Sequence, residues 1–101
     1  MPDLSADDSV PVKQASFVYL LRCRDGSLYC GWTNNLERRL KAHQAGKGSK
    51  YTRSRLPVEM IWWASCEDRS QAMRAEARIK RMKKQQKLQL AETPPGLKWL
   101  A

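Results

Sequence analysis

Five side chains that could bind phosphate, hold a cation or move a proton lie well apart along this chain. They are Tyr19, Tyr29, Arg39, His43 and Glu76. An arginine forms charge-assisted hydrogen bonds with phosphate, a carboxylate binds divalent cations, and a tyrosine or histidine can position a water molecule or accept its proton. Together they could cleave a phosphodiester bond if the fold brought them to one surface. Whether it does depends on the strands and helices that carry them.

The tyrosines fall on a predicted β-hairpin. Residues 17–23 are rich in β-branched and aromatic side chains, Asp25-Gly26 is a strong turn signal, and residues 27–32 return as a second strand. A two-residue loop would place Tyr19 and Tyr29 on opposite faces, because side chains alternate along a strand. A three-residue loop, with its glycine in the left-handed region, would place them on one face. A shared role requires the longer loop, and simple packing of the rings within the sheet is the alternative.

Arg39 and His43 fall on a predicted helix over residues 35–45, which Gly46 ends. At about 100° per residue, His43 lies inside the apolar stripe of this helix and Arg39 borders it, whereas Arg38 projects to the far side. A basic side chain on an inward face needs an anionic partner or a route to solvent. Arg39 is therefore the arginine that we expect at a phosphate site.

A loop with four cations and one aromatic residue is predicted over residues 46–57. Its candidate contacts are Lys47, Lys50, Tyr51, Arg53 and Arg55. The small residues of this loop let its backbone approach a ligand, and the basic side chains suit phosphate groups. The loop is a candidate contact for nucleic acid, with a solvated surface loop as the alternative.

Glu76 lies on a predicted helix over residues 71–83, which follows a third predicted strand over residues 58–66. On that helix Glu76 shares the inward face with small and apolar residues. Carboxylates are rarely buried unless they are paired or bound to a cation. Two explanations stay open, a structural ion pair with a neighbouring Arg or Lys and a metal site. A single carboxylate favours a loosely held, hydrated Mg²⁺ over a cage made by protein ligands alone.

Composition narrows the class of partner and the compartment. The 101 residues carry a net charge of +9, and 17 of the 19 Lys and Arg lie within residues 16–92, which favours a polyanion such as nucleic acid as partner. We expect one domain over residues 16–92, between an N-terminal arm (1–15) and a C-terminal tail (93–101). Three cysteines and the absence of a signal sequence or a long apolar run predict a cytoplasmic protein with reduced thiols, no zinc site and no membrane insertion.

The motifs over residues 16–92 resemble those of the GIY-YIG endonuclease domain. In chain order, the matching segments are Phe17-Val18-Tyr19, Tyr29-Cys30-Gly31, residues 35–40 followed by His43, and residues 75–80 around Glu76. Residues 46–52 and 67–70 are similar to those of the small stand-alone bacterial members of UPF0213-like type.

The resemblance implies an α+β fold in which helices flank a small three-stranded antiparallel sheet. It also implies metal-dependent hydrolysis of a nucleic-acid phosphodiester. Tyr19 would have a positioning role and Tyr29 a part in activating water, whereas Arg39 would stabilise the charge of the phosphate. His43 would be a hydrogen-bonding or proton-transfer partner, and Glu76 would hold Mg²⁺ or Mn²⁺.

We therefore expect a metal-dependent endonuclease that hydrolyses DNA phosphodiester bonds, with structure-selective DNA repair or processing as one role. The basic loop and Lys80 would contact the nucleic acid. The alternative is a non-catalytic nucleic-acid-binding module with the same fold, and a third interpretation is a scaffold subunit that acts only with a protein partner. The sequence leaves the oligomeric state and the choice between DNA and RNA open.

Overall fold

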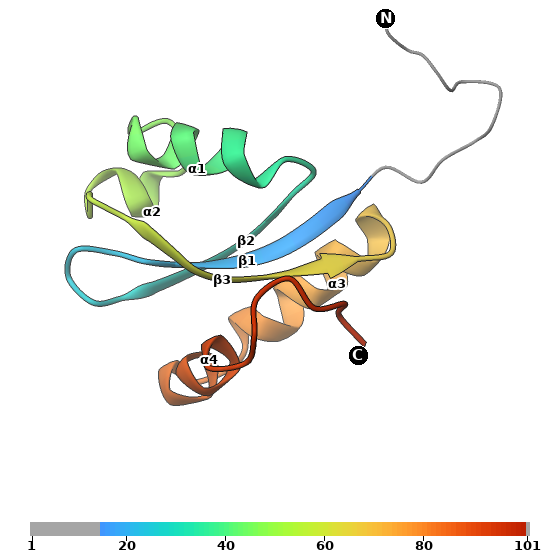
Figure 1. Ribbon diagram of the computed structural model, residues 1–101. Coiled ribbons are helices and arrows are strands. Elements are labelled where there is room, and N and C mark those ends of the chain that lie inside the picture. The colour runs from blue at the N-terminus through green and yellow to red at the C-terminus, as the bar shows by residue number, and fades with distance from the viewer. Residues whose placement is uncertain (1–14, 101) are drawn as a thin grey trace, which may run out of the picture.

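Three strands form one antiparallel sheet in the order β2-β1-β3 (Figure 1). The structure is a computed structural model that describes residues 15–100, so nearly all of the predicted N-terminal arm lies outside the described residues. β1 spans Ser16–Arg22, β2 spans Leu28–Thr33 and β3 spans Glu59–Cys66. Because β2 lies at an edge of the sheet, groups from both faces can meet beside it.

Helices cover both faces of this sheet (Figure 1). α1 (Leu36–Gln44) and the single-turn α2 (Lys50–Arg53) lie on one face, and α3 (Arg69–Lys80) and α4 (Lys84–Ala91) lie on the other. The predicted α+β fold, with a three-stranded antiparallel sheet between helices, is confirmed.

Side chains alternate between the two faces of the sheet, so the buried residues form two clusters, one on each face. The first cluster packs the sheet against α3 and consists of Val18, Leu20, Cys30, Trp62, Ala64, Cys66, Ala72, Ala75 and Ile79. The second faces α1 and consists of Tyr19, Leu21, Cys23 and Val58. β1 contributes to both clusters and is the most deeply buried strand, so the position of its side chains is fixed from both sides.

The hairpin between β1 and β2 has the three-residue loop that a shared tyrosine face requires. Leu21 pairs with Tyr29 and Tyr19 pairs with Gly31. The Cys23 amide donates to the carbonyl oxygen of Ser27 at 2.9 Å, which closes the loop over residues 24–26. Gly26 has φ 84°, in the left-handed region. The two tyrosines therefore lie on the same face of the sheet, as predicted.

Helix boundaries differ from the predicted ones where a capping side chain decides them. The Asp68 side chain accepts a hydrogen bond from the Gln71 amide at 2.8 Å, so α3 begins at Arg69, two residues earlier than predicted. The segment 46–57, predicted as a plain loop, contains α2. The Ser49 hydroxyl caps this turn by accepting from the Thr52 amide at 3.1 Å.

The C-terminal residues pack back onto the sheet. The Trp99 amide donates to the carbonyl oxygen of Ser65 at 2.8 Å, and the Trp99 ring packs edge-on against Trp62. Leu97 and Leu100 stay exposed. Within residues 15–100, no helix combines the length and the apolar character that crossing a membrane requires.

Replacing Gly26 with Ala should destabilise the fold by about 1 kcal/mol, because a Cβ atom strains the left-handed backbone. Urea unfolding followed by tryptophan fluorescence measures the change. Arg24→Ala, at an exposed position in the same loop, is the control and should shift the free energy of unfolding by less than about 0.5 kcal/mol. Equal midpoints for Gly26→Ala and the wild type would contradict the requirement for a left-handed residue.

Candidate active site

A buried hydrogen bond joins the sheet to α1 at the centre of the site. Tyr19 Oη lies 2.8 Å from His43 Nε2, and the two side chains are only 2% and 1% exposed. Tyr19 is held by the central strand, and His43 follows Leu40 on the inward side of α1. The predicted inward position of His43 is confirmed, and the phenol provides the partner that a buried imidazole needs.

Tyr29 meets the same histidine from the edge strand. Its ring centroid lies 5.3 Å from that of His43, in an edge-to-face arrangement, and 6.0 Å from that of Tyr51, in a stacked one. Unlike Tyr19, Tyr29 is partly exposed to solvent. The two tyrosines therefore converge on one imidazole, and Tyr29 is the more accessible of the two.

Glycine is required where the backbone passes close to these rings. A Cβ atom on Gly31 would lie 2.7 Å from Cζ of Tyr19, closer than real Cβ contacts allow. A Cβ atom on Gly48 would overlap the His43 ring in the same way. Gly31 therefore gives the Tyr19 hydroxyl its room beside β2, and Gly48 lets the chain before α2 close over His43.

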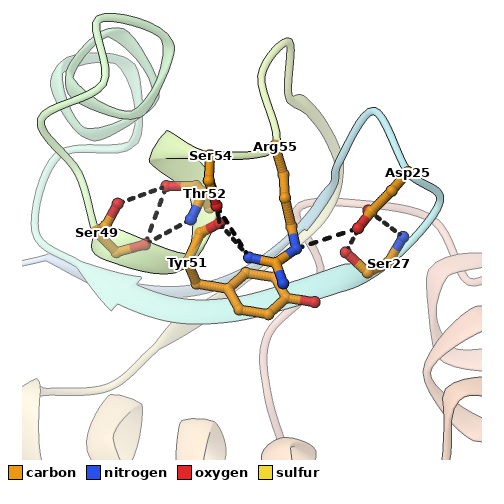
Figure 2. A network of polar contacts seen from close by, with 7 residues as sticks. All are labelled: Asp25, Ser27, Ser49, Tyr51, Thr52, Ser54 and Arg55. Carbon is orange, nitrogen blue, oxygen red and sulfur yellow. Dashed lines mark hydrogen bonds and ion pairs between the residues drawn. The ribbon is translucent and has the colours of Figure 1, made fainter.

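The second nitrogen of His43 has a partner that the sequence analysis did not identify. His43 Nδ1 lies 2.8 Å from Thr52 Oγ1, and Thr52 is fully buried. Thr52 Oγ1 is in turn 2.9 Å from Ser49 Oγ, and Figure 2 shows this pair at the start of α2. The signal available in the sequence was Ser49-Lys50-Tyr51-Thr52, a serine cap followed three residues later by a hydroxyl.

Burial keeps the central pair uncharged near neutral pH. Burial of the Tyr19 phenol, together with the nearby Tyr29, raises the pKa of Tyr19 well above its ordinary value, although Arg39 opposes this. Burial, followed by the positive charge of Arg39, lowers the pKa of His43 below its ordinary value of 6.5. The site therefore holds a neutral phenol against a neutral imidazole.

Arg39 opens onto a surface depression beside the end of β2. The depression has a volume of about 370 Å³ and is lined by Trp32, Thr33, Asn34, Arg38 and Arg39. The charge of Arg39 acts on both Tyr19 and His43, so its guanidinium group lies close to the buried pair. Arg39 thus has the route to solvent that its inward position demands, and an anion in the depression could reach it.

Glu76 approaches from the helix layer on the other face of the sheet. Its charge contributes to raising the pKa of Cys30, to about 12, after the larger effect of burial, and it acts on Tyr19 in the same direction. Glu76 therefore lies near the edge strand, within electrostatic reach of the two side chains.

The surroundings of Glu76 suit a loosely held divalent ion. Its side chain is 23% exposed, and the ammonium group of Lys80 is 3.7 Å away, beyond hydrogen-bonding distance. Within residues 15–100 no three His, Cys, Asp or Glu side chains gather into a metal site. An ion here would have one protein carboxylate and would take its other ligands from water and phosphate, as Mg²⁺ commonly does. Of the two explanations left open for Glu76, the ion pair is present, with Lys80, and the metal site stays a prediction.

Two residues of the predicted basic loop, Tyr51 and Arg55, make contacts with other residues of the protein. The Arg55 guanidinium group lies 3.8 Å from the centroid of the Tyr51 ring and 3.1 Å from a carboxylate oxygen of Asp25 (Figure 2). Hydrogen bonds from Ser27, with a smaller effect of Arg55, lower the pKa of Asp25. Arg55 and Tyr51 thus fasten α2 to the hairpin loop, although Tyr51 is exposed to solvent. Lys47, Lys50 and Arg53 are also exposed.

Folding should respond to pH through His43, the single histidine of the chain. Its pKa is lower in the folded state than in the unfolded state, so the unfolded chain binds the proton more readily below about pH 6.5. The free energy of unfolding should therefore be at its highest above this pH. It should fall as the pH drops from 7.5 to 5.5, by at most about 1.4 kcal/mol per pH unit. Urea unfolding at fixed ionic strength measures it.

His43→Gln is the control, because glutamine does not titrate. The variant should be less stable overall but should lose the dependence between pH 7.5 and 5.5. Parallel pH dependences for the wild type and His43→Gln would rule out the depressed pKa.

Comparison with known proteins places the chain in a family. The model of the GIY-YIG catalytic domain matches residues 15–89. A UPF0213 protein of Clostridium perfringens is 51% identical over 75 residues, which cover 74% of this chain and 81% of that protein. A UPF0213 protein of Nitratidesulfovibrio vulgaris is 47% identical over 96 residues, which cover 95% of this chain and 82% of that protein.

Solved structures agree with this placement. The solution NMR structure of a UPF0213 protein of Bacillus halodurans is 39% identical, with a TM-score of 0.52, and the match covers 81% of this chain and 87% of that one. The solution NMR structure of an E. faecalis protein is 43% identical, with a TM-score of 0.56 and coverage of 83% and 90%. The chain therefore belongs to the GIY-YIG family and is a relative of its UPF0213 proteins.

Proposed function

We propose that this protein is a divalent-metal-dependent endonuclease that hydrolyses DNA phosphodiester bonds. The observation that supports this most directly is the convergence of Tyr19 and Tyr29 on His43, within electrostatic reach of Arg39 and Glu76. A cation, a carboxylate and hydroxyl groups within electrostatic reach of one another are the groups that phosphodiester hydrolysis needs, and the cation lines a surface depression.

Each residue has a role that follows from its surroundings. Arg39, next to the depression, would neutralise the charge of the phosphate. Tyr29, partly exposed, would orient the attacking water molecule, and Tyr19, which keeps its proton, would donate a hydrogen bond to the reacting group. Glu76 would hold a divalent ion, which supplies Lewis-acid stabilisation of the leaving oxygen when bound.

Cations flank this site on both sides and would carry the nucleic acid. Lys47, Lys50 and Arg53 are exposed on the α1–α2 side of the sheet. On the other side, the charge of Lys80 acts on Cys30 of the edge strand, and Lys84 reaches to 3.9 Å from the Cβ position of Gly26 at the hairpin loop. A strand lying along the edge of β2 would meet positive charge before and after the scissile phosphate.

Cleavage should depend on Glu76 and Arg39 in the presence of Mg²⁺ or Mn²⁺. Glu76→Gln and Arg39→Ala should each lower kcat by about a hundredfold or more, because each removes a charge that stabilises the transition state. Lys41→Ala, which removes an exposed cation of the same helix that does not line the depression, should stay within about threefold of the wild type. Labelled single-stranded, duplex and branched DNA substrates form the test panel, and a matched RNA panel distinguishes the nucleic acids.

The outcome also separates the enzyme from a non-catalytic binding module. If the wild type binds these substrates but cleaves none of them with either metal, the protein is a binding module and the nuclease proposal fails. Equal losses in Lys41→Ala and Arg39→Ala would also contradict the assignment of Arg39 as the phosphate-binding residue.

Binding should weaken with salt, in proportion to the number of phosphate contacts. The Glu76→Gln variant allows binding to be measured without cleavage. Adding Lys47→Gln and Lys50→Gln to it should make the slope of log Kobs against log salt less negative, by about 0.7 to 0.9 per lost contact. Fluorescence anisotropy at several salt concentrations measures it. Lys98→Gln, beside β3 and away from the edge of β2, should leave the slope unchanged. Equal slopes in all variants would remove these lysines from the binding surface.

A further inference from the structure

His43 is held by a hydroxyl group on each of its two ring nitrogens. Tyr19 Oη lies 2.8 Å from Nε2, and Thr52 Oγ1 lies 2.8 Å from Nδ1. All three side chains are at most 2% exposed, so water does not compete for these positions. A neutral imidazole carries one proton, so one of its nitrogens must donate and the other must accept. The direction of these two hydrogen bonds is therefore a single choice.

Ser49 makes that choice. Its hydroxyl oxygen already accepts the Thr52 amide proton at 3.1 Å, because Ser49 caps α2. Thr52 Oγ1 lies 2.9 Å away and can accept the proton of Ser49, although the distance alone allows either oxygen to be the donor. When Ser49 donates to Thr52, the Thr52 hydroxyl must turn its own proton elsewhere, and His43 Nδ1 is the acceptor at 2.8 Å. The carbonyl oxygen of Ser49 is a poorer acceptor for this proton, at 3.4 Å.

We propose that Thr52, oriented by Ser49, is a positioning residue that fixes His43 as the tautomer with its proton on Nε2. His43 then donates to the oxygen of Tyr19. The proton of Tyr19 is directed away from the imidazole and into the site. In the reverse arrangement Tyr19 would donate to His43 and would have no proton left for a ligand. Each hydrogen bond in this series is thus donated in the same direction, from Ser49 at the cap of α2 to the oxygen of Tyr19.

The loop before α2 is shaped to hold this arrangement. Gly48 lies against the His43 ring so closely that a Cβ atom would overlap it. Arg55 ties the other end of α2 to Asp25 in the hairpin loop, and its guanidinium group also donates to the carbonyl oxygen of Tyr51 at 2.8 Å (Figure 2). α2 is thereby fixed at both ends, and its threonine stays aligned with the histidine.

The catalytic consequence rests on the proposed function. A phenol that accepts from His43 keeps its proton for a phosphate oxygen or a water molecule that reaches it when the substrate binds, and the imidazole does not have to change its tautomer at that moment. Thr52 and Ser49 would act only through His43 and Tyr19. Their loss should therefore affect the chemical step more than substrate binding.

The tautomer can be measured directly, because the chain contains a single histidine. Long-range ¹H–¹⁵N correlation spectra of uniformly ¹⁵N-labelled protein at pH 7.5 show which ring nitrogen carries the proton. We expect Nε2 in the wild type and in Thr52→Ser, which keeps the hydroxyl group. In Ser49→Ala the hydroxyl of Thr52 is no longer oriented, so the tautomer with its proton on Nδ1 should become populated. A wild-type proton on Nδ1, or an unchanged tautomer in Ser49→Ala, would overturn the proposal.

Kinetics give the second measurement. Thr52→Val, which has nearly the same shape without the hydroxyl, should lower kcat at least about tenfold and leave KM within about twofold, whereas Thr52→Ser should restore most of the rate. Circular dichroism confirms that each variant is folded, and Ser49→Ala replaces Thr52→Val if the latter does not fold. Equal rates for Thr52→Val and the wild type would overturn the positioning role. If the wild type cleaves nothing, the proposed function fails, but the spectra still decide the tautomer.

Discussion

The hydrogen bond between the Tyr19 hydroxyl and His43 Nε2 is the interaction on which the rest of the site depends. It joins the central strand to α1 in a place that water does not reach. A buried imidazole with an unsatisfied nitrogen would cost about 1 to 3 kcal/mol, so the fold must also supply a partner for Nδ1. Thr52 meets that demand and brings α2 against α1. The need to satisfy two buried nitrogens thus fixes β1, α1 and α2 relative to one another.

The edge position of β2 explains how residues from opposite faces can serve one site. Arg39 lies in the helix layer on one face and Glu76 in the layer on the other, and a wide sheet would separate them. Here only one strand lies beyond β1 on this side, and that strand carries Gly31 opposite Tyr19. The missing side chain leaves room for the phenol, so the charges of Arg39 and Glu76 both reach it.

Sequence periodicity predicted the parts of this site that belong to regular elements. The parity of the hairpin showed that a three-residue loop would place both tyrosines on one face, and the structure has that loop. Helical rotation placed His43 and Glu76 inward. It could not predict Thr52, because a helix of four residues has no periodicity and the partner of Thr52 comes from another helix. It also could not predict that Arg55 is engaged, since Asp25 precedes it by 30 residues and only the fold brings them together.

The neutrality of the central pair follows mainly from its burial. Burial, and after it the positive charge of Arg39, makes a protonated His43 unfavourable. A neutral histidine can accept on one nitrogen while it donates on the other, whereas an imidazolium can only donate. Arg39, the proposed phosphate-binding residue, therefore also helps to keep the imidazole in the neutral form that can relay a directed hydrogen bond.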